Sequence, residues 1–249
     1  MRQETQLFLS YQTLIDIHCH QYSQVGHMQI LSRDAHELSN KADGILPKPQ
    51  ASKHQTEADL LLSAGYFSLG IHPWFIELQN TDTAFQTIAS FMHHPRLLAI
   101  GECGLDKCID TALDKQIDIF TQQIKLAQQF GKPMIVHCVR AFSELLQLKK
   151  HLAPSQAWII HGFTGKPPLA EQLLKHGCYL SFGKALLQSG SQASMALLTT
   201  PNDRLFLETD AADAAIDTIY TAAAKIRDVD IACLQQQILN NFKRVFMHD

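Results

Sequence analysis

Two histidines alternate with other residues in the stretch LIDIHCH, which covers residues 14–20. Alternate side chains of a β-strand share one face, so Asp16, His18 and His20 would lie together and the residues between them would form an apolar face. The two imidazoles would stand roughly 6–7 Å apart along such a strand. Because imidazole is the commonest metal ligand in proteins, this face is typical of a metal site.

Further short apolar runs also end in residues of the types that bind metals. These residues are His72, Glu102, His137, His161, Glu208 and Asp210. A lone histidine at the end of a strand is more often a hydrogen-bonded structural residue than a ligand. Repetition over several runs is harder to explain in that way, and it favours a site for one or two divalent cations.

The apolar runs predict eight β-strands, over residues 14–18, 28–32, 66–72, 97–102, 133–138, 157–162, 178–183 and 204–210. Helical patterns follow most of them, over residues 82–93, 113–130, 141–152, 168–176, 191–199, 216–227 and 231–246. This alternation predicts an α/β fold, a single TIM-type (β/α)8 barrel. The carboxyl ends of all strands in such a barrel lie on one rim, which would bring the metal-binding residue types together.

Two connections are unusual for a barrel. Only about eight residues separate the first two runs, so we expect the helix after strand 1 to be short or missing. Residues 33–62 are polar and rich in Pro and Lys, which indicates a long loop before a short helix. The sequence shows no repeat, low-complexity tract or linker, and we therefore expect one domain over residues 1–249.

Composition limits the function classes. The chain has 249 residues, 46% of them hydrophobic, and a formal net charge of −3, so it lacks the basic excess that holds long nucleic acids by charge. It has no apolar run of the roughly 20 residues that a membrane span needs, and no secretory leader is recognisable. The six cysteines are scattered. We expect a cytoplasmic protein with reduced thiols and no membrane partner.

A series of motifs resembles a known family. DIHCH, GIHPW, AIGECGLD, PMIVHC, HGFTG and FLETD follow one another in the order found in TatD-related metal-dependent hydrolases, and the similarity extends to the closing NNFKRVF. This family is a branch of the amidohydrolase-like metal barrels, and its members include divalent-metal DNases. The resemblance implies a barrel hydrolase that acts on phosphodiester bonds.

The resemblance also implies a centre of two divalent ions (Zn, Mg or Mn). Its ligands would be His18 and His20 for one ion, His137 and His161 for the other, Glu102 as a bridge between the ions, and Asp210 beside the first. Asp210 would also be the catalytic residue, because a carboxylate there can orient the attacking water and accept its proton.

The surroundings of this expected centre depart from the family pattern. Tyr22 stands where an acidic residue usually follows the second histidine, and Val139 where an arginine is frequent. The segment after FLETD leads toward a helix without the family's usual arginine-bearing loop. The predicted metal ligands are thus all present, whereas the residues that hold the substrate differ.

Three further residues have open roles. His72 would contact or support the substrate site, or it would position the turn before Pro73, and the sequence does not choose between these roles. Asp106 would support a ligand or cap a loop. Asp16 shares the strand face of His18 and would support it from below.

The prediction from sequence is a metal-dependent deoxyribonuclease whose partner is a DNA end or a small phosphodiester. One alternative is a hydrolase of a small phosphoester, amide or lactone on the same metal barrel. A second alternative is a binding module that keeps its metal for stability and has no catalytic activity. The oligomeric state is open, and a monomer agrees with the composition.

Overall fold

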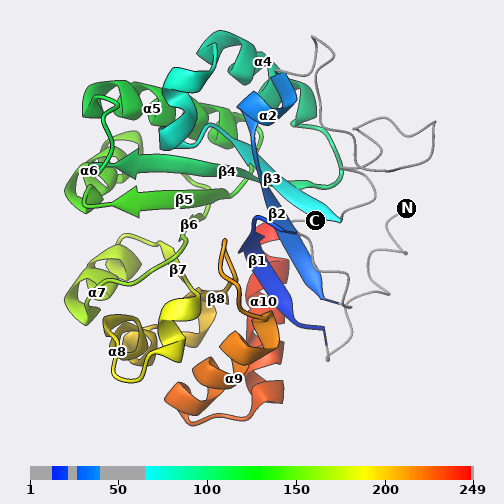
Figure 1. Cartoon of the computed structure of the whole chain (residues 1–249), viewed down its shortest axis with the longest axis vertical. Coiled ribbons are helices and arrows are strands. Elements are labelled where there is room, and N and C mark those ends of the chain that lie inside the picture. Colours follow the sequence, from blue (N-terminus) through cyan, green and yellow to red (C-terminus); the bar gives the residue numbers. More distant parts are fainter. Residues whose placement is uncertain (1–12, 22–26, 40–64, 248–249) are drawn as a thin grey trace. The chain divides into compact units, whose positions relative to one another are not determined.

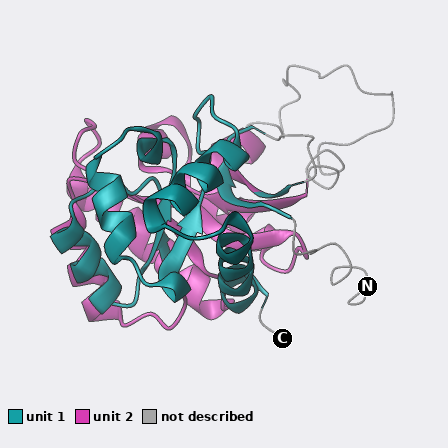
Figure 2. Ribbon diagram, turned by 90° about the horizontal axis from the view of Figure 1, so that it is seen from below, with its two compact units in different colours: residues 1–29, 159–249 teal, residues 30–158 magenta. Residues whose placement is uncertain are grey.

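The computed structural model describes residues 13–21, 27–39 and 65–247. The chain divides into two compact units, which Figure 2 distinguishes by colour. Unit 1 contains residues 1–29 and 159–249, and unit 2 contains residues 30–158. One domain over residues 1–249 stays a prediction.

Eight strands form one sheet whose order follows the chain (Figure 1). Each predicted strand is present, as β1 (Ile15–Cys19), β2 (Met28–Asp34), β3 (Tyr66–Gly70), β4 (Leu97–Asp106), β5 (Met134–Val139), β6 (Trp158–Ile160), β7 (Tyr179–Phe182) and β8 (Leu205–Leu207). The pairings that can be followed within each unit are parallel. Parallel strands that alternate with helices confirm the predicted TIM-type (β/α)8 class.

The first and last strands are neighbours in unit 1. The backbone N–H of Asp210 donates to the carbonyl of His18 at 2.9 Å, and the N–H of His20 donates to the carbonyl of Asp210 at 3.3 Å. A parallel bridge joins Cys19 to Asp210 between these bonds. A sheet whose last strand returns to its first has the closure that a barrel requires.

In unit 2, β4 is longer than the predicted run over residues 97–102. It continues to Asp106, and all ten of its residues are buried. Gly104 makes this possible, because a Cβ atom there would lie 1.9 Å from the carbonyl oxygen of His137 on β5. Only glycine permits such a close approach of two backbones.

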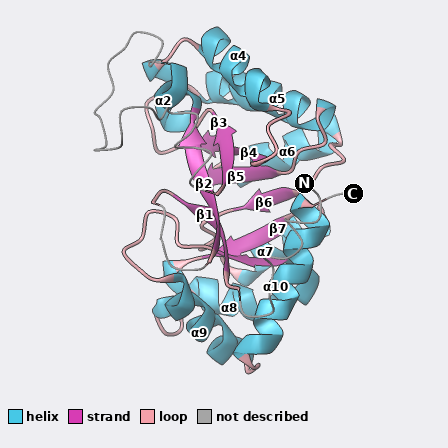
Figure 3. Cartoon of the chain, turned by 90° about the vertical axis from the view of Figure 1, so that its right-hand side faces the viewer, coloured by secondary structure: helices cyan, strands magenta, loops and turns pink. Residues whose placement is uncertain are grey.

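Helices cover the strands of each unit (Figure 3). They are α2 (Ala35–Ser39), η1 (Pro73–Leu78), α4 (Thr81–Phe91), α5 (Leu113–Gln129), α6 (Phe142–Leu152), α7 (Pro167–Lys175), η2 (Lys184–Leu187), α8 (Gln192–Thr199), η3 (Asn202–Arg204), α9 (Ile216–Arg227) and α10 (Ile231–Phe246). The seven predicted helices are confirmed within two residues at either end. The 3₁₀-helices and α2 were not predicted, because segments this short carry too few turns for a periodic pattern.

The two unusual connections are only partly described. Between β1 and β2, the described residues 20, 21 and 27 are not helical, and residues 22–26 lie outside the described part. Of the loop predicted over residues 33–62, residues 33–39 instead form the end of β2 and helix α2, because β2 pairs with β3 as far as Asp34 and Gly70. Residues 40–62 lie outside the described part.

Two of the predictions from composition can be compared with the structure. None of the six cysteines is in a disulfide. Within the described ranges, no helix combines the length and the apolar character that crossing a membrane requires.

Candidate active site

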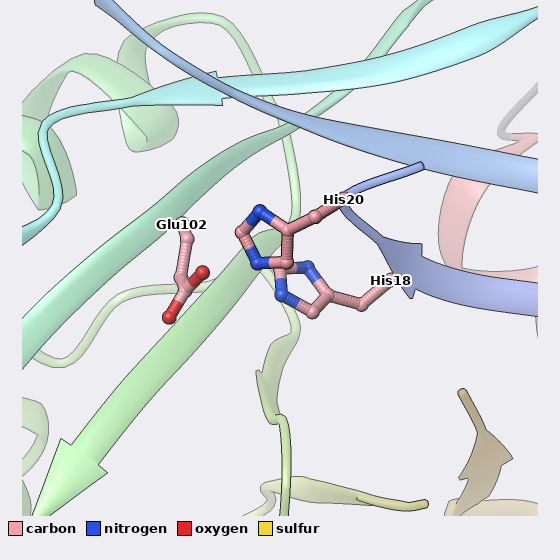
Figure 4. Close-up of side chains that lie close together, drawn as sticks. All are labelled: His18, His20 and Glu102. Atoms are coloured by element: carbon pink, nitrogen blue, oxygen red, sulfur yellow. The ribbon is translucent and has the colours of Figure 1, made fainter. Parts of the chain in front are cut away.

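Unit 1 gathers four of the predicted site residues. His18 and His20 leave the end of β1 with ring centroids 5.0 Å apart and nearly perpendicular planes (Figure 4). The ring of His161, directly after β6, lies 4.3 Å from that of His18. The Oδ1 atom of Asp210 is 3.3 Å from Nε2 of His20 and 3.6 Å from Nε2 of His18. The side chains of His18, His161 and Asp210 offer ligand atoms close enough to hold one metal ion.

Asp210 is ionised in this setting. Burial raises the pKa of its carboxyl group, but hydrogen bonds from His18 and His20 and the charges of His18 and His161 lower the pKa further than burial raises it. The net result is a pKa below the ordinary value. A carboxylate that keeps its charge suits both a metal ligand and a proton acceptor.

Asp16 supports the end of β1 through hydrogen bonds, as the sequence suggested. Its Oδ1 atom accepts hydrogen bonds from the backbone N–H groups of His18 at 3.3 Å and Thr209 at 3.0 Å, and its Oδ2 atom accepts one from the Thr209 hydroxyl at 2.6 Å. Burial raises the pKa of Asp16 to about 6, although the Thr209 hydrogen bonds oppose the shift. Asp16 thus supports His18 through the backbone N–H of that residue.

Glu208 lies behind His161, one of the predicted ligands. Its side chain is fully buried, and its Oε1 atom accepts a hydrogen bond from the backbone N–H of Gly162. The same oxygen lies 3.5 Å from Nδ1 of His161. A carboxylate placed behind a histidine ring is a common arrangement around metal sites.

Unit 2 gathers the other predicted residues around Glu102, which Figure 4 also draws. The Oε1 atom of Glu102 lies 2.9 Å from Nε2 of His72 and 2.9 Å from Nδ1 of His137. Glu102 and His72 are buried, and His137 is partly exposed. These three side chains also offer ligand atoms close enough to hold one ion.

Asp106 contacts His137, a predicted ligand, and also caps a loop. Its Oδ2 atom lies 3.2 Å from Nε2 of His137 and accepts a hydrogen bond from the indole N–H of Trp74 at 2.8 Å. Its Oδ1 atom accepts one from the backbone N–H of Cys108 at 2.7 Å, which caps the turn after β4. Burial raises the pKa of Asp106, but these hydrogen bonds and the charge of His137 outweigh burial and lower it.

Further supporting residues do not stand out in the sequence. Asp34 is buried at the end of β2, and its Oδ2 atom accepts a hydrogen bond from the backbone N–H of His72 at 2.7 Å. Gln123 of α5 pairs with both backbone groups of Ile71, just before His72. Neither residue type stands out in a sequence, although a glutamine on the apolar face of a helix is a signal worth following.

The predicted assignment of ligands to two ions joins residues of both units. His137 belongs to unit 2 and His161 to unit 1, so their predicted joint binding of one ion stays a prediction. The same holds for Glu102 as a bridge to the ion of His18 and His20.

A cavity of about 590 Å³ adjoins Asp210 within unit 1. The segment after β8, residues 211–217, forms much of its wall, together with Gln21, His27 and Gln29. Four carboxylates line it, and its described lining includes no lysine or arginine. The cavity therefore lacks the fixed positive charge that would favour several phosphate groups.

The family model for TatD-related DNases matches residues 15–247 of the chain. The chain is 34% identical over 149 residues to YabD of Bacillus subtilis, named an uncharacterized metal-dependent hydrolase, and the match covers 58% of each protein. It is 31% identical over 146 residues to the 3′-5′ ssDNA/RNA exonuclease TatD of Erwinia tasmaniensis, covering 57% of this chain and 56% of that protein. The chain spans little more than half the length of these curated relatives.

The crystal structure of YjjV, a TatD homologue from Escherichia coli, is similar over 96% of this chain and 100% of YjjV. The TM-score is 0.76 and the sequence identity 22%, which shows that the two proteins share a fold. Because the family model extends over nearly the whole chain and the motifs that carry the resemblance lie within it, this chain belongs to the TatD-related DNase family.

Proposed function

We propose that this protein is a metal-dependent hydrolase that cleaves phosphodiester bonds in DNA, and that its ligand residues form one centre for two divalent ions. The observation that carries the proposal is the grouping of histidines and carboxylates at strand carboxyl ends, with His18, His161 and Asp210 in one unit and His72, Glu102 and His137 in the other. In a barrel of this class, strand carboxyl ends share one rim, which supports a single centre.

The residues fit divalent ions chemically. Imidazole nitrogens and carboxylate oxygens are the ligands that zinc and manganese accept, and carboxylates also suit magnesium. Asp106 and Glu208 stand behind His137 and His161 at 3.2 Å and 3.5 Å, as carboxylates commonly do behind histidine ligands. In this proposal His18, His20 and Asp210 would hold one ion, His137 and His161 would hold the second, and Glu102 would serve both.

Bound divalent ions supply positive charge for the developing negative charge on the phosphate, and they activate water at neutral pH. The chain's own contribution is position and proton transfer. The ionised carboxylate of Asp210 accepts the proton of the attacking water, and the hydrogen bonds of Asp16 to β1 and to Thr209 keep the backbone around Asp210 in place.

Short or single-stranded DNA ends and small phosphodiesters are the substrates that we propose. The names of the relatives support nucleic acid, since one is a 3′-5′ ssDNA/RNA exonuclease. The acidic wall of the cavity beside Asp210 and the net charge of −3 disfavour long duplex, because such binding needs many phosphate contacts.

The test combines metal analysis with a substrate panel. We expect up to two divalent ions per chain, loss of activity on chelation, and faster cleavage of a dinucleotide or a short single strand than of long duplex. Turnover only on a lactone, amide or small phosphomonoester would favour the alternative hydrolase. Full metal loading without any turnover would favour a binding module and contradict the proposal.

Two variants separate the proposed roles. Glu102→Ala should lower the occupancy of both ions, since a bridging carboxylate serves both. Asp210→Asn should retain more metal but lower the turnover strongly, because an amide cannot accept the proton. Normal metal content and near-normal rate in Glu102→Ala would contradict the bridging role.

A further inference from the structure

We propose that His72 is a positioning residue that donates a hydrogen bond to Glu102, and that it is not a metal ligand. The inference rests on the proposed function in one respect, since it takes Glu102 as a ligand. His72, Glu102 and His137 lie close enough to hold an ion together, so proximity alone would make His72 a third ligand. The position of the N–H proton on its imidazole ring argues against the role of a metal ligand.

The tautomer of His72 follows from its neighbour on the chain. The Nδ1 atom of His72 accepts a hydrogen bond from the backbone N–H of Trp74 at 3.1 Å. A backbone N–H only donates, so Nδ1 carries the lone pair and the proton of the neutral ring is on Nε2. Nε2 lies 2.9 Å from Oε1 of Glu102. A nitrogen that carries a proton donates to that oxygen and has no lone pair for a metal ion.

The fold holds the ring in this orientation. His72 is the N-cap residue of η1, and Pro73 at the first helical position fixes the turn that brings the N–H of Trp74 to the ring. The backbone N–H of His72 donates to Asp34, which is itself buried and hydrogen-bonded to His36 and Gln79. Rotation of the ring by half a turn would break the bond from Trp74 and leave its N–H without this acceptor.

His137 differs from His72 in the nitrogen that it turns to Glu102. Its Nε2 atom lies 3.2 Å from the carboxylate of Asp106, and its Nδ1 atom lies 2.9 Å from Oε1 of Glu102. Because both neighbours are carboxylates, either nitrogen of the neutral ring can carry the proton, and the other keeps its lone pair. With the proton on Nε2, toward Asp106, the lone pair of Nδ1 is available to an ion, which is the common arrangement of a carboxylate behind a histidine ligand. The ring of His72 lacks this choice, because the N–H of Trp74 occupies the lone pair of its Nδ1 atom.

Histidine NMR on the unaltered protein tests this directly. With isotopically labelled histidine, the ring of His72 should show a protonated Nε2 and an unprotonated Nδ1 in the metal-free protein. After loading with an NMR-active cadmium isotope, His137 should show scalar coupling between Nδ1 and the metal, and His72 should show none. The signal that disappears in His72→Gln assigns the ring. Cadmium coupling to His72, or a proton on its Nδ1, would overturn the inference.

Metal titration of variants provides the second test. Glutamine has an amide N–H that can donate to Glu102, whereas alanine has no donor. We expect His72→Ala to weaken cadmium binding about 10–100-fold and His72→Gln to stay within a few-fold of the unaltered protein. Equal losses in the two variants would indicate a ligand and overturn the inference. The matched control is His151→Gln, which alters an exposed histidine near the end of α6 and should leave cadmium affinity unchanged.

The two proposals fail in different ways. If the unaltered protein binds no cadmium, the proposed function fails. The tautomer of His72 in the metal-free protein still decides this inference, because the hydrogen bonds from Trp74 and to Glu102 need no ion.

Discussion

Thr209 joins the last strand of the barrel to the first through the side chain of Asp16. Its hydroxyl donates to Oδ2 of Asp16 at 2.6 Å, and its backbone N–H donates to Oδ1 at 3.0 Å. Asp16 precedes His18 by two residues, and Thr209 directly precedes Asp210. One fully buried carboxylate therefore links the backbone of His18, a predicted ligand, to the residue before Asp210, the proposed proton acceptor.

Replacing Thr209 tests this connection. Thr209→Val keeps the shape of the side chain but removes the hydroxyl, so we expect the free energy of unfolding to fall by about 1.5–3 kcal/mol, the contribution of a hydrogen bond to a charged group. Urea denaturation measures the change. Thr209→Ser keeps the hydroxyl and should retain most of the stability. If the valine variant is as stable as the unaltered protein, the hydroxyl does not support Asp16.

The carboxylate of Asp106 should govern metal affinity without touching the metal. We expect Asp106→Asn to weaken metal binding about 10–100-fold, because an amide nitrogen cannot accept from both His137 and the Trp74 indole. Calorimetric titration with manganese measures the affinity. Trp74→Phe removes only one of the two donors to Oδ2 and should have a smaller effect. An asparagine variant with unchanged affinity would mean that Asp106 only caps the turn at Cys108.

The sequence predicted the strands well because their cores are short apolar runs with abrupt polar ends. It placed the end of β4 at Glu102, whereas the strand continues to Asp106. The charged residue Glu102 and the two nearby glycines, Gly101 and Gly104, indicate the end of a strand. The residues after Glu102 stay in the sheet because β5 runs beside them, and register between strands cannot be read from one strand alone.

Helix α5 shows a second limit. The apolar period predicts a stripe through Leu113, Ile117, Phe120, Ile124, Ala127 and Phe130. Phe120, Ile124 and Ala127 are buried, whereas the other three are partly exposed. Gln116 and Gln123 are buried on the same side, where each pairs with the N–H and the carbonyl of one residue of the neighbouring strand ends. A pattern of hydrophobicity cannot predict them, because their place follows from hydrogen bonds to the backbone groups of Asp106 and Ile71.

The candidate site was predictable by residue type but not by contact. Strand-end position sufficed to select His18, Glu102 and Asp210 as candidates. The hydrogen bonds around them involve residues whose types are common in loops: Asp34 accepts from the N–H of His72, and the Thr209 hydroxyl donates to Asp16. Such contacts depend on side-chain orientation at distant positions in the chain, which no local pattern encodes.

Gly104 should be intolerant of any side chain. A Cβ atom there would lie 1.9 Å from the carbonyl oxygen of His137, and backbone on β5 cannot move away without parting the strands. We expect Gly104→Ala to lower the free energy of unfolding by about 3 kcal/mol or more.

Gly177 is the matched control, because its φ is +76° but no atom lies within 4 Å of the added Cβ. Gly177→Ala should cost only about 1–2 kcal/mol for the left-handed conformation. Equal losses in urea denaturation would contradict the role of close strand approach.

Tyr220 should stabilise β1 at the strand's first residue. Its hydroxyl donates to the carbonyl of Ile15 at 3.0 Å and accepts from the N–H of Ile15 at 3.1 Å. The side chain is buried, and burial raises the pKa of the hydroxyl, so Tyr220 stays neutral and keeps its proton to donate. Helix α9 thereby holds the strand that carries His18 and His20.

Tyr220→Phe would leave two buried backbone groups of Ile15 without this partner. We expect the free energy of unfolding to fall by about 2–4 kcal/mol, since each unsatisfied group costs roughly 1–3 kcal/mol. Tyr179→Phe is the matched control, because that ring is also buried while its hydroxyl makes no hydrogen bond within the described part of the chain. Thermal and urea denaturation should therefore separate the two phenylalanine variants clearly. Equal stability of both variants would show that α9 holds β1 by apolar packing alone, and that the phenol hydroxyl contributes nothing to the position of the histidines.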